Sequence, residues 1–340
     1  MEQISNIEHI RLRTGMYIGY PGDGKQRTDG LYSLLTHIID NSVDEFIMGY
    51  GKTITIDIKG GKRVIICDNG RGLPLSSVPE LFDGSYIGGI CPERPKFNVT
   101  NVIIVNALSS DLMVSSFREG QRSWAHFRYG VLVDSGIENS EEENGMLVEF
   151  QPDETIFGDF AFDPDITRDI ISQYAYMNQN LSLILNGTKY EMKDGLLDMI
   201  KSMAASGYTE NFIHYKDEHV EFAIANDIIP YDSRVYSFVN GHMTQTGGPH
   251  QDALIKAART IRKEFGKAKG SDGLRGFLGI INLNLPHPVF VDSMKHELGN
   301  RYLNEESPSK ETKIQPYIMK HVKEELRKAY NSNSNCGSDI

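Results

Sequence analysis

Three polar side chains recur along one edge of a segment whose apolar residues have helical spacing. His37, Asn41 and Asp44 follow one another at i, i+4 and i+7, so in a helix they share a face. The run D-N-G-R-G at 68–72 ends a β-branched segment, and its glycines let the backbone approach a ligand closely. A carboxylate accepts hydrogen bonds from an exocyclic amine, and an amide oxygen can complete the octahedral shell of Mg²⁺. Asp68 and Asn41 are therefore candidates for holding a nucleotide base and a magnesium ion.

A helix followed by a β-hairpin must position these residues. Apolar residues at helical spacing over 31–46 predict a helix with one face in the core. Isoleucines that alternate with polar residues predict a strand over 54–58, and Gly60-Gly61 is typical of a type I′ or II′ turn. The returning strand, 64–68, then ends at Asp68. The D-x-G-x-G match alone is weak, because most such short matches are plain turns.

Length and composition describe an ordinary folded protein with two domains. A chain of 340 residues is too long for one typical core, and 39% hydrophobic with 24% charged residues is a common balance. The sequence has no run of about 18 apolar residues and no apolar signal segment, which predicts a cytoplasmic location and no membrane partner. Cys67, Cys91 and Cys336 are scattered without metal-ligand spacing, so we expect free thiols.

The formal net charge of −11 argues against a protein that coats DNA through its whole surface, since such binding requires neutralised phosphates. A local contact remains open, because an expected helix carries a basic face with further basic residues near it. These residues are Lys256, Arg259, Lys263 and Lys267 on the face, with Arg262 and Lys269 beside it. Such a face can equally be an ordinary solvated surface.

Three motifs together carry a family resemblance. The sequences R-T-G-M-Y-I-G at 13–19, D-N-S-V-D-E at 40–45 and D-N-G-R-G-L-P at 68–74 stand in the order and spacing of the GHKL ATPases. The chain resembles the ATPase region of the type IIA topoisomerase B subunits, those of gyrase and topoisomerase IV, from His9 to Lys328. The resemblance implies an α+β fold: a GHKL (Bergerat) sandwich of mixed sheet and helices, followed by a ribosomal-S5-like transducer domain.

The domain boundaries follow from this resemblance and from a break in the pattern at 151–163. We expect an ATP-binding domain at 1–158 with a shortened lid at 73–100, a helix–strand connection at 159–215, a transducer at 216–330 and a disordered tail at 331–340. The strands are predicted at 112–116, 124–129, 131–133, 146–150, 181–185, 221–225, 235–239 and 277–285, and the helices at 166–177, 251–265 and 314–330.

The resemblance also implies that ATP and Mg²⁺ are the ligands, and it assigns individual contacts. The residues at the family's nucleotide-binding positions are Asn41, Glu45, Asp68, Gly70, Arg71, Gly72, Pro74, Met146 and Lys295. Asn41 matches the magnesium ligand, and Met146 stands where the family commonly has a threonine beside the adenine. Lys295 matches a transducer lysine that reaches the γ-phosphate, where a cation stabilises the transferred phosphoryl group. The alternative is that Lys295 is an ordinary loop lysine.

Two departures from the family concern the phosphate end. His37 stands where the family has the glutamate that acts as general base; histidine can do base chemistry, or it is a polar residue left after the base was lost. The glycine-rich phosphate loop is replaced by K-F-N-V-T-N at 96–101, in front of V-N-A-L-S at 105–109. The β-branched Val99 and Thr100 do not suit positive φ angles, so we expect weak triphosphate binding. Lys96 is the candidate for a compensating charge.

Two functions of different classes follow. The first is an enzyme part: the ATPase and transducer module of a type IIA topoisomerase B subunit. It would couple ATP binding and hydrolysis to gate closure and DNA strand passage, with impaired hydrolysis. Its partners would be DNA through the full topoisomerase, the A subunit through other domains, and a second copy in a homodimer. The second is a divergent, non-hydrolysing GHKL paralogue that serves as a nucleotide-binding, dimerisation or regulatory module.

Overall fold

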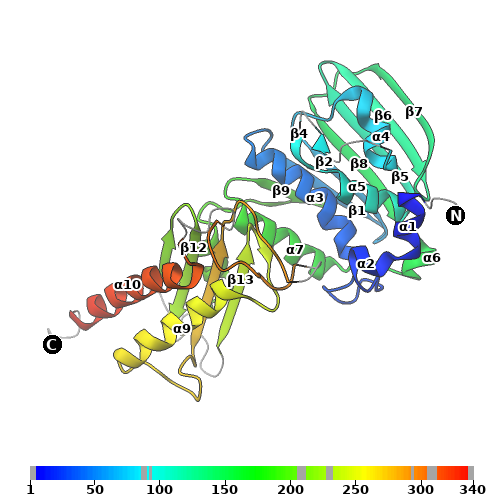
Figure 1. Cartoon of the computed structure of the whole chain (residues 1–340). Coiled ribbons are helices and arrows are strands. Elements are labelled where there is room, and N and C mark those ends of the chain that lie inside the picture. The colour runs from blue at the N-terminus through cyan, green and yellow to red at the C-terminus, as the bar shows by residue number, and fades with distance from the viewer. Residues whose placement is uncertain are drawn as a thin grey trace. The chain divides into compact units, whose positions relative to one another are not determined.

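The computed structural model describes residues 5–85, 90–91, 94–204, 212–226, 233–291, 295–304 and 312–335. It divides into two compact units, Met1–Met192 and Lys193–Ile340. Each unit has a hydrophobic core of its own. Figure 1 shows both units, with many of their helices and strands labelled.

The first unit is built on a mixed sheet of eight strands in the order β10-β9-β1-β2-β8-β5-β6-β7. β1 and β9 are parallel, and the other neighbouring pairs are antiparallel. The strands are β1 Thr53–Lys59, β2 Arg63–Asp68, β5 Ser109–Arg118, β6 Gln121–Arg128, β7 Val131–Asn139, β8 Gly145–Pro152, β9 Ser182–Leu185 and β10 Thr188–Tyr190. All the strands predicted in this part of the sequence are present.

Helices pack on this sheet, and their apolar side chains form part of the hydrophobic core. They are α1 Asn6–Leu12, α2 Thr14–Ile18, α3 Leu31–Ile47, α4 Val78–Asp83, α5 Val99–Ala107, α6 Glu154–Phe157 and α7 Pro164–Met177. α3 packs on β2, α5 packs on β5 and β8, and α3 and α5 contact each other. α3 is the predicted helix, and it buries Leu31, Leu35 and Ile38 in the core. A separate two-stranded sheet, β3 Ile90–Cys91 with β4 Arg94–Asn98, precedes α5.

The hairpin between β1 and β2 has the turn that its glycines predict. Gly60 and Gly61 have φ angles of 60° and 71°, and the N–H of Lys62 donates to the carbonyl of Lys59 at 3.1 Å. Positive φ at both central residues defines a type I′ turn. The pairing Ile54↔Asp68 in this hairpin places Asp68 beside the start of β1.

The division between the units lies later in the chain than the boundary expected at 151–163. β9 pairs in parallel with β1, from Thr53↔Ser182 to Ile56↔Leu185, and α7 packs against β9. Residues 159–192 therefore belong to the first unit and do not form a connection between domains. The break at Pro152 and Gly158 instead flanks the short α6, which Asp153 caps through Thr155 N–H.

The second unit is a five-stranded sheet covered by helices. Its strand order is β11-β12-β15-β13-β14, and β13 and β15 are parallel. The elements are α8 Leu196–Met203, β11 Phe212–Lys216, β12 Val220–Asn226, β13 Arg234–Val239, β14 His242–Met243, α9 Pro249–Glu264, β15 Phe277–Leu283 and α10 Ile314–Asn335. α9 packs on β13, β15 and α10. The strands and helices predicted here are all present.

Helix α10 corrects the tail expected to be disordered from residue 331. The helix continues to Asn335. Tyr330 is buried and donates a hydrogen bond to Asn226 at 3.1 Å, which anchors the last turns to the sheet. Residues 336–340 lie outside the described residues, and so does Cys336, whereas Cys67 and Cys91 are free thiols.

Candidate functional site

Asp68 is held in one orientation at the end of β2. The Ser42 hydroxyl donates to Asp68 Oδ2 at 2.8 Å, and the N–H of Gly70 donates to Oδ1 at 2.9 Å. Burial raises the pKa of Asp68 above its ordinary value, and the charge of Arg94 and these two hydrogen bonds offset this only in part. The predicted base-binding carboxylate is therefore buried and oriented.

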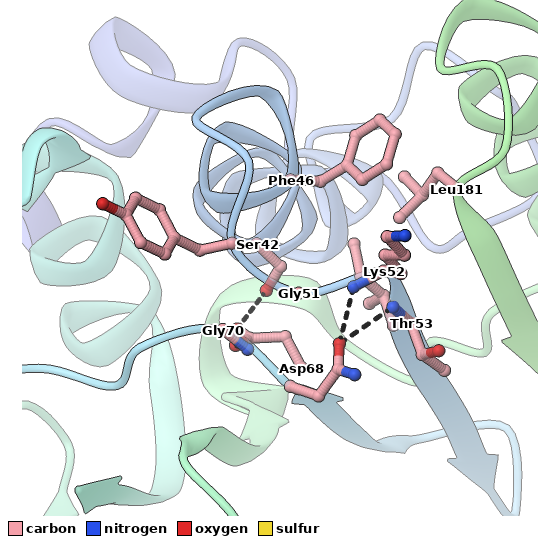
Figure 2. A pocket seen from close by; sticks show the side chains of 11 residues that line it. Ser42, Phe46, Gly51, Lys52, Thr53, Asp68, Gly70 and Leu181 are labelled. Carbon is pink, nitrogen blue, oxygen red and sulfur yellow. Dashed lines mark hydrogen bonds between the residues drawn. The ribbon is translucent and has the colours of Figure 1, made fainter.

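A small pocket lies beside Asp68 (Figure 2). Its empty volume is about 150 Å³, and its lining is Ser42, Phe46, Tyr50, Gly51, Lys52, Thr53, Ile54, Asp68, Asn69, Gly70 and Leu181. Of the described residues predicted to bind a nucleotide, Asp68 and Gly70 line this pocket. Asn41, Glu45 and Met146 are not part of its lining, so this pocket is not the whole of the predicted nucleotide site.

The glycines after Asp68 are required by close packing within the protein. A Cβ on Gly70 would lie 3.0 Å from Asp68 Oδ1. Gly72 has a φ of 73°, and a Cβ there would lie 2.6 Å from the carbonyl oxygen of Phe117. We predicted that these glycines let the backbone approach a ligand. In the structure they also let the turn pack against the chain's own atoms.

Pro74 follows this turn directly in the sequence, and Met146 comes much later, in β8. Pro74 directly precedes a short 3₁₀ helix, Leu75–Ser77. Met146 is buried in β8, where it pairs in register with Asp68 on one side and with Ser116 on the other. The structure thus brings Met146 next to Asp68, as the predicted site requires.

Both polar atoms of the Asn41 side chain contact the backbone of Asn98. The N–H of Asn98 donates to Asn41 Oδ1 at 2.7 Å, and Asn41 Nδ2 donates to the Asn98 carbonyl at 3.4 Å. The Asn41 side chain is fully buried. Mg²⁺ requires ligand oxygens in a nearly ideal octahedron, whereas this amide oxygen is directed at a protein N–H. The arrangement seen does not fit the predicted magnesium ligand.

The segment that replaces the glycine loop is regular secondary structure. Residues Arg94–Asn98 form β4, and α5 follows at once. The side chain of Asn98 accepts a hydrogen bond from the N–H of Asn101 at 3.1 Å, so it caps α5 from within the chain. The described residues of β4 and α5 have no positive φ, which leaves no backbone nest of the kind that holds phosphates. The side chain of Lys96 lies outside the described residues, so its compensating charge stays a prediction.

Arg94 is a residue of this site that we did not predict. Its side chain is 2% exposed, and Nη2 donates to the backbone carbonyl of Asn41 at 3.0 Å. Nε lies 3.0 Å from Glu45 Oε1, and the guanidinium lies 5.0 Å from the centre of the Phe97 ring. Nε and Nη1 make no hydrogen bond of good geometry with any described residue. The signal in the sequence was an arginine inside the shortened lid, three residues before the aromatic Phe97.

Glu45 joins two arginines. Arg71 donates from Nη2 to Glu45 Oε1 at 2.8 Å and from Nε to Oε2 at 3.1 Å, and its guanidinium stacks 3.8 Å from the Tyr50 ring. Burial raises the pKa of Glu45, but the hydrogen bonds from Arg71 and the charge of Arg94 outweigh burial and leave the pKa below its ordinary value. We call Asn41, Glu45, Arg71, Arg94 and Phe97 the Arg94 cluster.

The two candidate catalytic residues lie in different units. His37 is half-buried in α3, one turn before Asn41. Lys295 belongs to the second unit, where it is exposed and has a φ of 60°. Its reach to a phosphate stays a prediction.

The basic face of α9 is smaller than the sequence indicated. Lys256, Arg259 and Lys263 are exposed on the helix, and Arg259 donates to the Asp272 carbonyl at 3.0 Å. Arg262 is instead buried, and it donates to Asn226 and to backbone carbonyls. Arg262 therefore holds the second unit together and is not part of a nucleic-acid surface.

Comparisons with known sequences give a consistent set of relatives. Residues 26–128 match the family described as histidine kinase-, DNA gyrase B-, and HSP90-like ATPase. The chain is 36% identical over 305 residues to the DNA topoisomerase 4 B subunit of Borreliella burgdorferi, covering 87% of this chain and 51% of that protein. It is 26% identical over 367 residues to the DNA gyrase B subunit of Campylobacter jejuni, covering 97% and 45%. The chain thus spans about half the length of these relatives.

Solved structures align with nearly the whole length of the chain. The 43K ATPase domain of Thermus thermophilus gyrase B, in complex with an aminocoumarin, aligns with a TM-score of 0.69 at 24% identity over 97% of this chain and 96% of that one. The ATPase region of Saccharomyces cerevisiae topoisomerase II aligns with a TM-score of 0.73 at 18% identity over 98% of both chains. These likenesses confirm the predicted α+β fold. Among the described residues, no helix has the length and apolar character needed to cross a bilayer.

Proposed function

Because this chain belongs to the family of type IIA topoisomerase B subunits, we propose that it is the nucleotide-binding and transducer module of such a protein. In the whole protein this module would couple ATP binding to closure of a gate through which DNA passes. DNA, an A subunit and a second copy of the chain would then be its partners, in the cytoplasm. These partners follow from the family and stay proposals for this chain.

The orientation of Asp68 is the observation that carries this proposal. An exocyclic amine of a purine needs an acceptor fixed in position, and the Ser42 hydroxyl and the Gly70 N–H fix the Asp68 carboxylate. Met146 lies beside it in the sheet, where its thioether can pack on a purine face. A buried carboxylate with a raised pKa in this setting is typical of a functional position.

Hydrolysis depends on the Asn41 end of the site. A phosphoryl-transfer site works mainly by positioning groups and stabilising charge, and here Asn41 is bonded to Asn98 while α5 is capped by its own chain. His37 stands at the position of the family's base. We therefore propose that ATP is hydrolysed slowly, with Lys295 as the transducer cation.

A second candidate function rests on the same bond between Asn41 and Asn98. If that bond persists when a nucleotide binds, the chain is a nucleotide-binding module without hydrolysis, and nucleotide occupancy alone would act as its signal. The two candidates share the Asp68 site and differ in turnover.

Calorimetric titration with a non-hydrolysable ATP analogue tests the shared part. The change Asp68→Asn replaces a charged acceptor by an amide, and hydrogen bonds to charged groups contribute about 1.5–3 kcal/mol, so we expect affinity to fall roughly 10- to 100-fold. Asp134→Asn, at an exposed position of β7, is the matched control and should leave affinity unchanged. Affinity that survives Asp68→Asn would exclude this nucleotide site.

A further inference from the structure

Strand β4 lies outside the eight-stranded sheet, although its Phe97 is buried in the core of the first unit. Its sheet partner is β3, which has two residues, and two-stranded sheets are marginally stable on their own. The described bonds that tie it to α3 are the Asn98–Asn41 amide pair and the contacts of Arg94 with Asn41 and Glu45. If β4 leaves α3, the hydrogen bonds of the eight-stranded sheet stay intact, and Phe97 leaves the core.

The burial of Arg94 is itself costly. A guanidinium has five N–H donors, and buried donors that lack a good acceptor cost free energy relative to hydration in water. Nε and Nη1 of Arg94 are buried donors without an acceptor in good hydrogen-bond geometry. If Arg94 moves into water it regains these hydrogen bonds, and Glu45 keeps its second partner, Arg71. These hydrogen bonds to water offset part of the cost of taking Arg94 away from Glu45 and Asn41.

The residues that Arg94 engages are those that a nucleotide would need. Asn41 and Glu45 belong to the predicted nucleotide contacts, and both are occupied by β4. A nucleotide that uses Asn41 and Glu45 therefore competes with the seated strand for these two side chains.

We propose that Arg94 is an internal competitor of the nucleotide: with its guanidinium seated beside Glu45 and Asn41 the site is closed, and binding requires β4 to leave α3. This inference rests on the proposed nucleotide-binding function. Arg94 determines how much of the protein is competent to bind, and the apparent affinity is lowered by that fraction.

The test compares Arg94→Ala with the wild-type chain in calorimetric titrations with a non-hydrolysable ATP analogue. Arg122→Ala, on β6 of the same unit, is the matched control, because Arg122 pairs with Glu138 at the surface. If the open form is about one tenth of the wild-type population, Arg94→Ala raises affinity about 10-fold, and Arg122→Ala leaves it unchanged. Equal affinity of all three proteins would overturn the role of Arg94 and leave the nucleotide site standing. Absence of binding to all three would overturn both.

A second measurement decides the matter if Arg94→Ala does not fold. The amide hydrogen of Asn98 is protected in the wild-type chain by its bond to Asn41 Oδ1. Displacement of β4 breaks that bond, so hydrogen exchange at Asn98 should accelerate when the ATP analogue binds. Unchanged or slower exchange at Asn98 with the analogue bound would show that β4 stays seated, against the proposal.

Discussion

The Asp68 end and the Asn41 end of the candidate site contain side chains of the types expected, but they have different neighbours. At the Asp68 end, Ser42 and Gly70 hold the carboxylate and a small pocket remains beside it. At the Asn41 end, the amide is bonded to the backbone of Asn98. The residue types alone therefore do not reveal whether a side chain is available to a ligand.

The difference comes from the segment that faces each end. Asp68 is faced by β8, a long strand in the middle of the sheet, whose position is fixed by pairing on both sides. Asn41 is faced by β4, a short strand outside that sheet. The segment that replaces the glycine loop provides hydrogen-bond partners for the Asn41 side chain of α3 from within the protein.

The largest effect is expected in turnover. Loss of a positioned general base typically costs about 10²–10⁴-fold in rate, so phosphate release should be slower by that factor than for the Borreliella topoisomerase 4 B subunit, assayed in parallel. His37→Glu should raise the rate of phosphate release by less than about 10-fold, because a new base does not break the hydrogen bond between Asn41 and Asn98. If this chain released phosphate as fast as the Borreliella protein and Asn41→Ala abolished that activity, the Asn41 end would be as available to a ligand as the Asp68 end, against this account.

The next effect is in stability, measured by urea denaturation. Glu45→Ala removes a buried anion from between two arginines, and breaking a buried ion pair typically costs about 3–5 kcal/mol. Glu149→Ala is the matched control, since Glu149 pairs with Arg63 at a partly exposed position and should cost less than about 1 kcal/mol. Similar losses for the two variants would mean that the Arg94 cluster is not a packed part of the fold.

A smaller effect is a difference in pH dependence between the two ends. Burial, opposed only in part by Arg94, holds the pKa of Asp68 above its ordinary 3.8, so its contribution to stability rises as pH falls through the folded pKa. The pKa of Glu45 is below its ordinary 4.5, because Arg71 and Arg94 outweigh burial; its contribution is present above 4.5 and is lost as pH falls through the folded pKa.

Urea midpoints between about pH 7 and pH 3 measure this difference when Asp68→Asn and Glu45→Gln are each compared with the wild-type chain. The stability advantage of the wild type over Asp68→Asn should grow toward low pH, and its advantage over Glu45→Gln should shrink. If the stability advantage of the wild type changed with pH in the same direction for both variants, the pKa values of Asp68 and Glu45 would not be shifted in opposite directions.

Local patterns were sufficient to predict most of the elements. Helical spacing predicted α3, and the glycine pair predicted the turn between β1 and β2. The division between the units was not predictable in this way, because it depends on β9 pairing with β1, far apart in the sequence. Such long-range pairing leaves no periodic signal of its own.

The candidate site was predictable in its residue types and not in its contacts. The glycine-free stretch before α5 indicated a lost phosphate loop, and the structure has a strand and a capped helix there. The role of Arg94 depends on which face of α3 the strand meets, which local sequence does not determine. The same holds for Arg262, which the pattern placed beside a basic face and which is buried.

The most direct measurement of the difference between the two ends compares adenosine with a non-hydrolysable ATP analogue in calorimetric titrations of the wild-type chain. Adenosine needs the Asp68 end alone, whereas the triphosphate gains from any backbone or cation that grips its phosphates. We predict dissociation constants within about 5-fold of each other. Triphosphate binding tighter than adenosine by about 100-fold or more would contradict a closed Asn41 end.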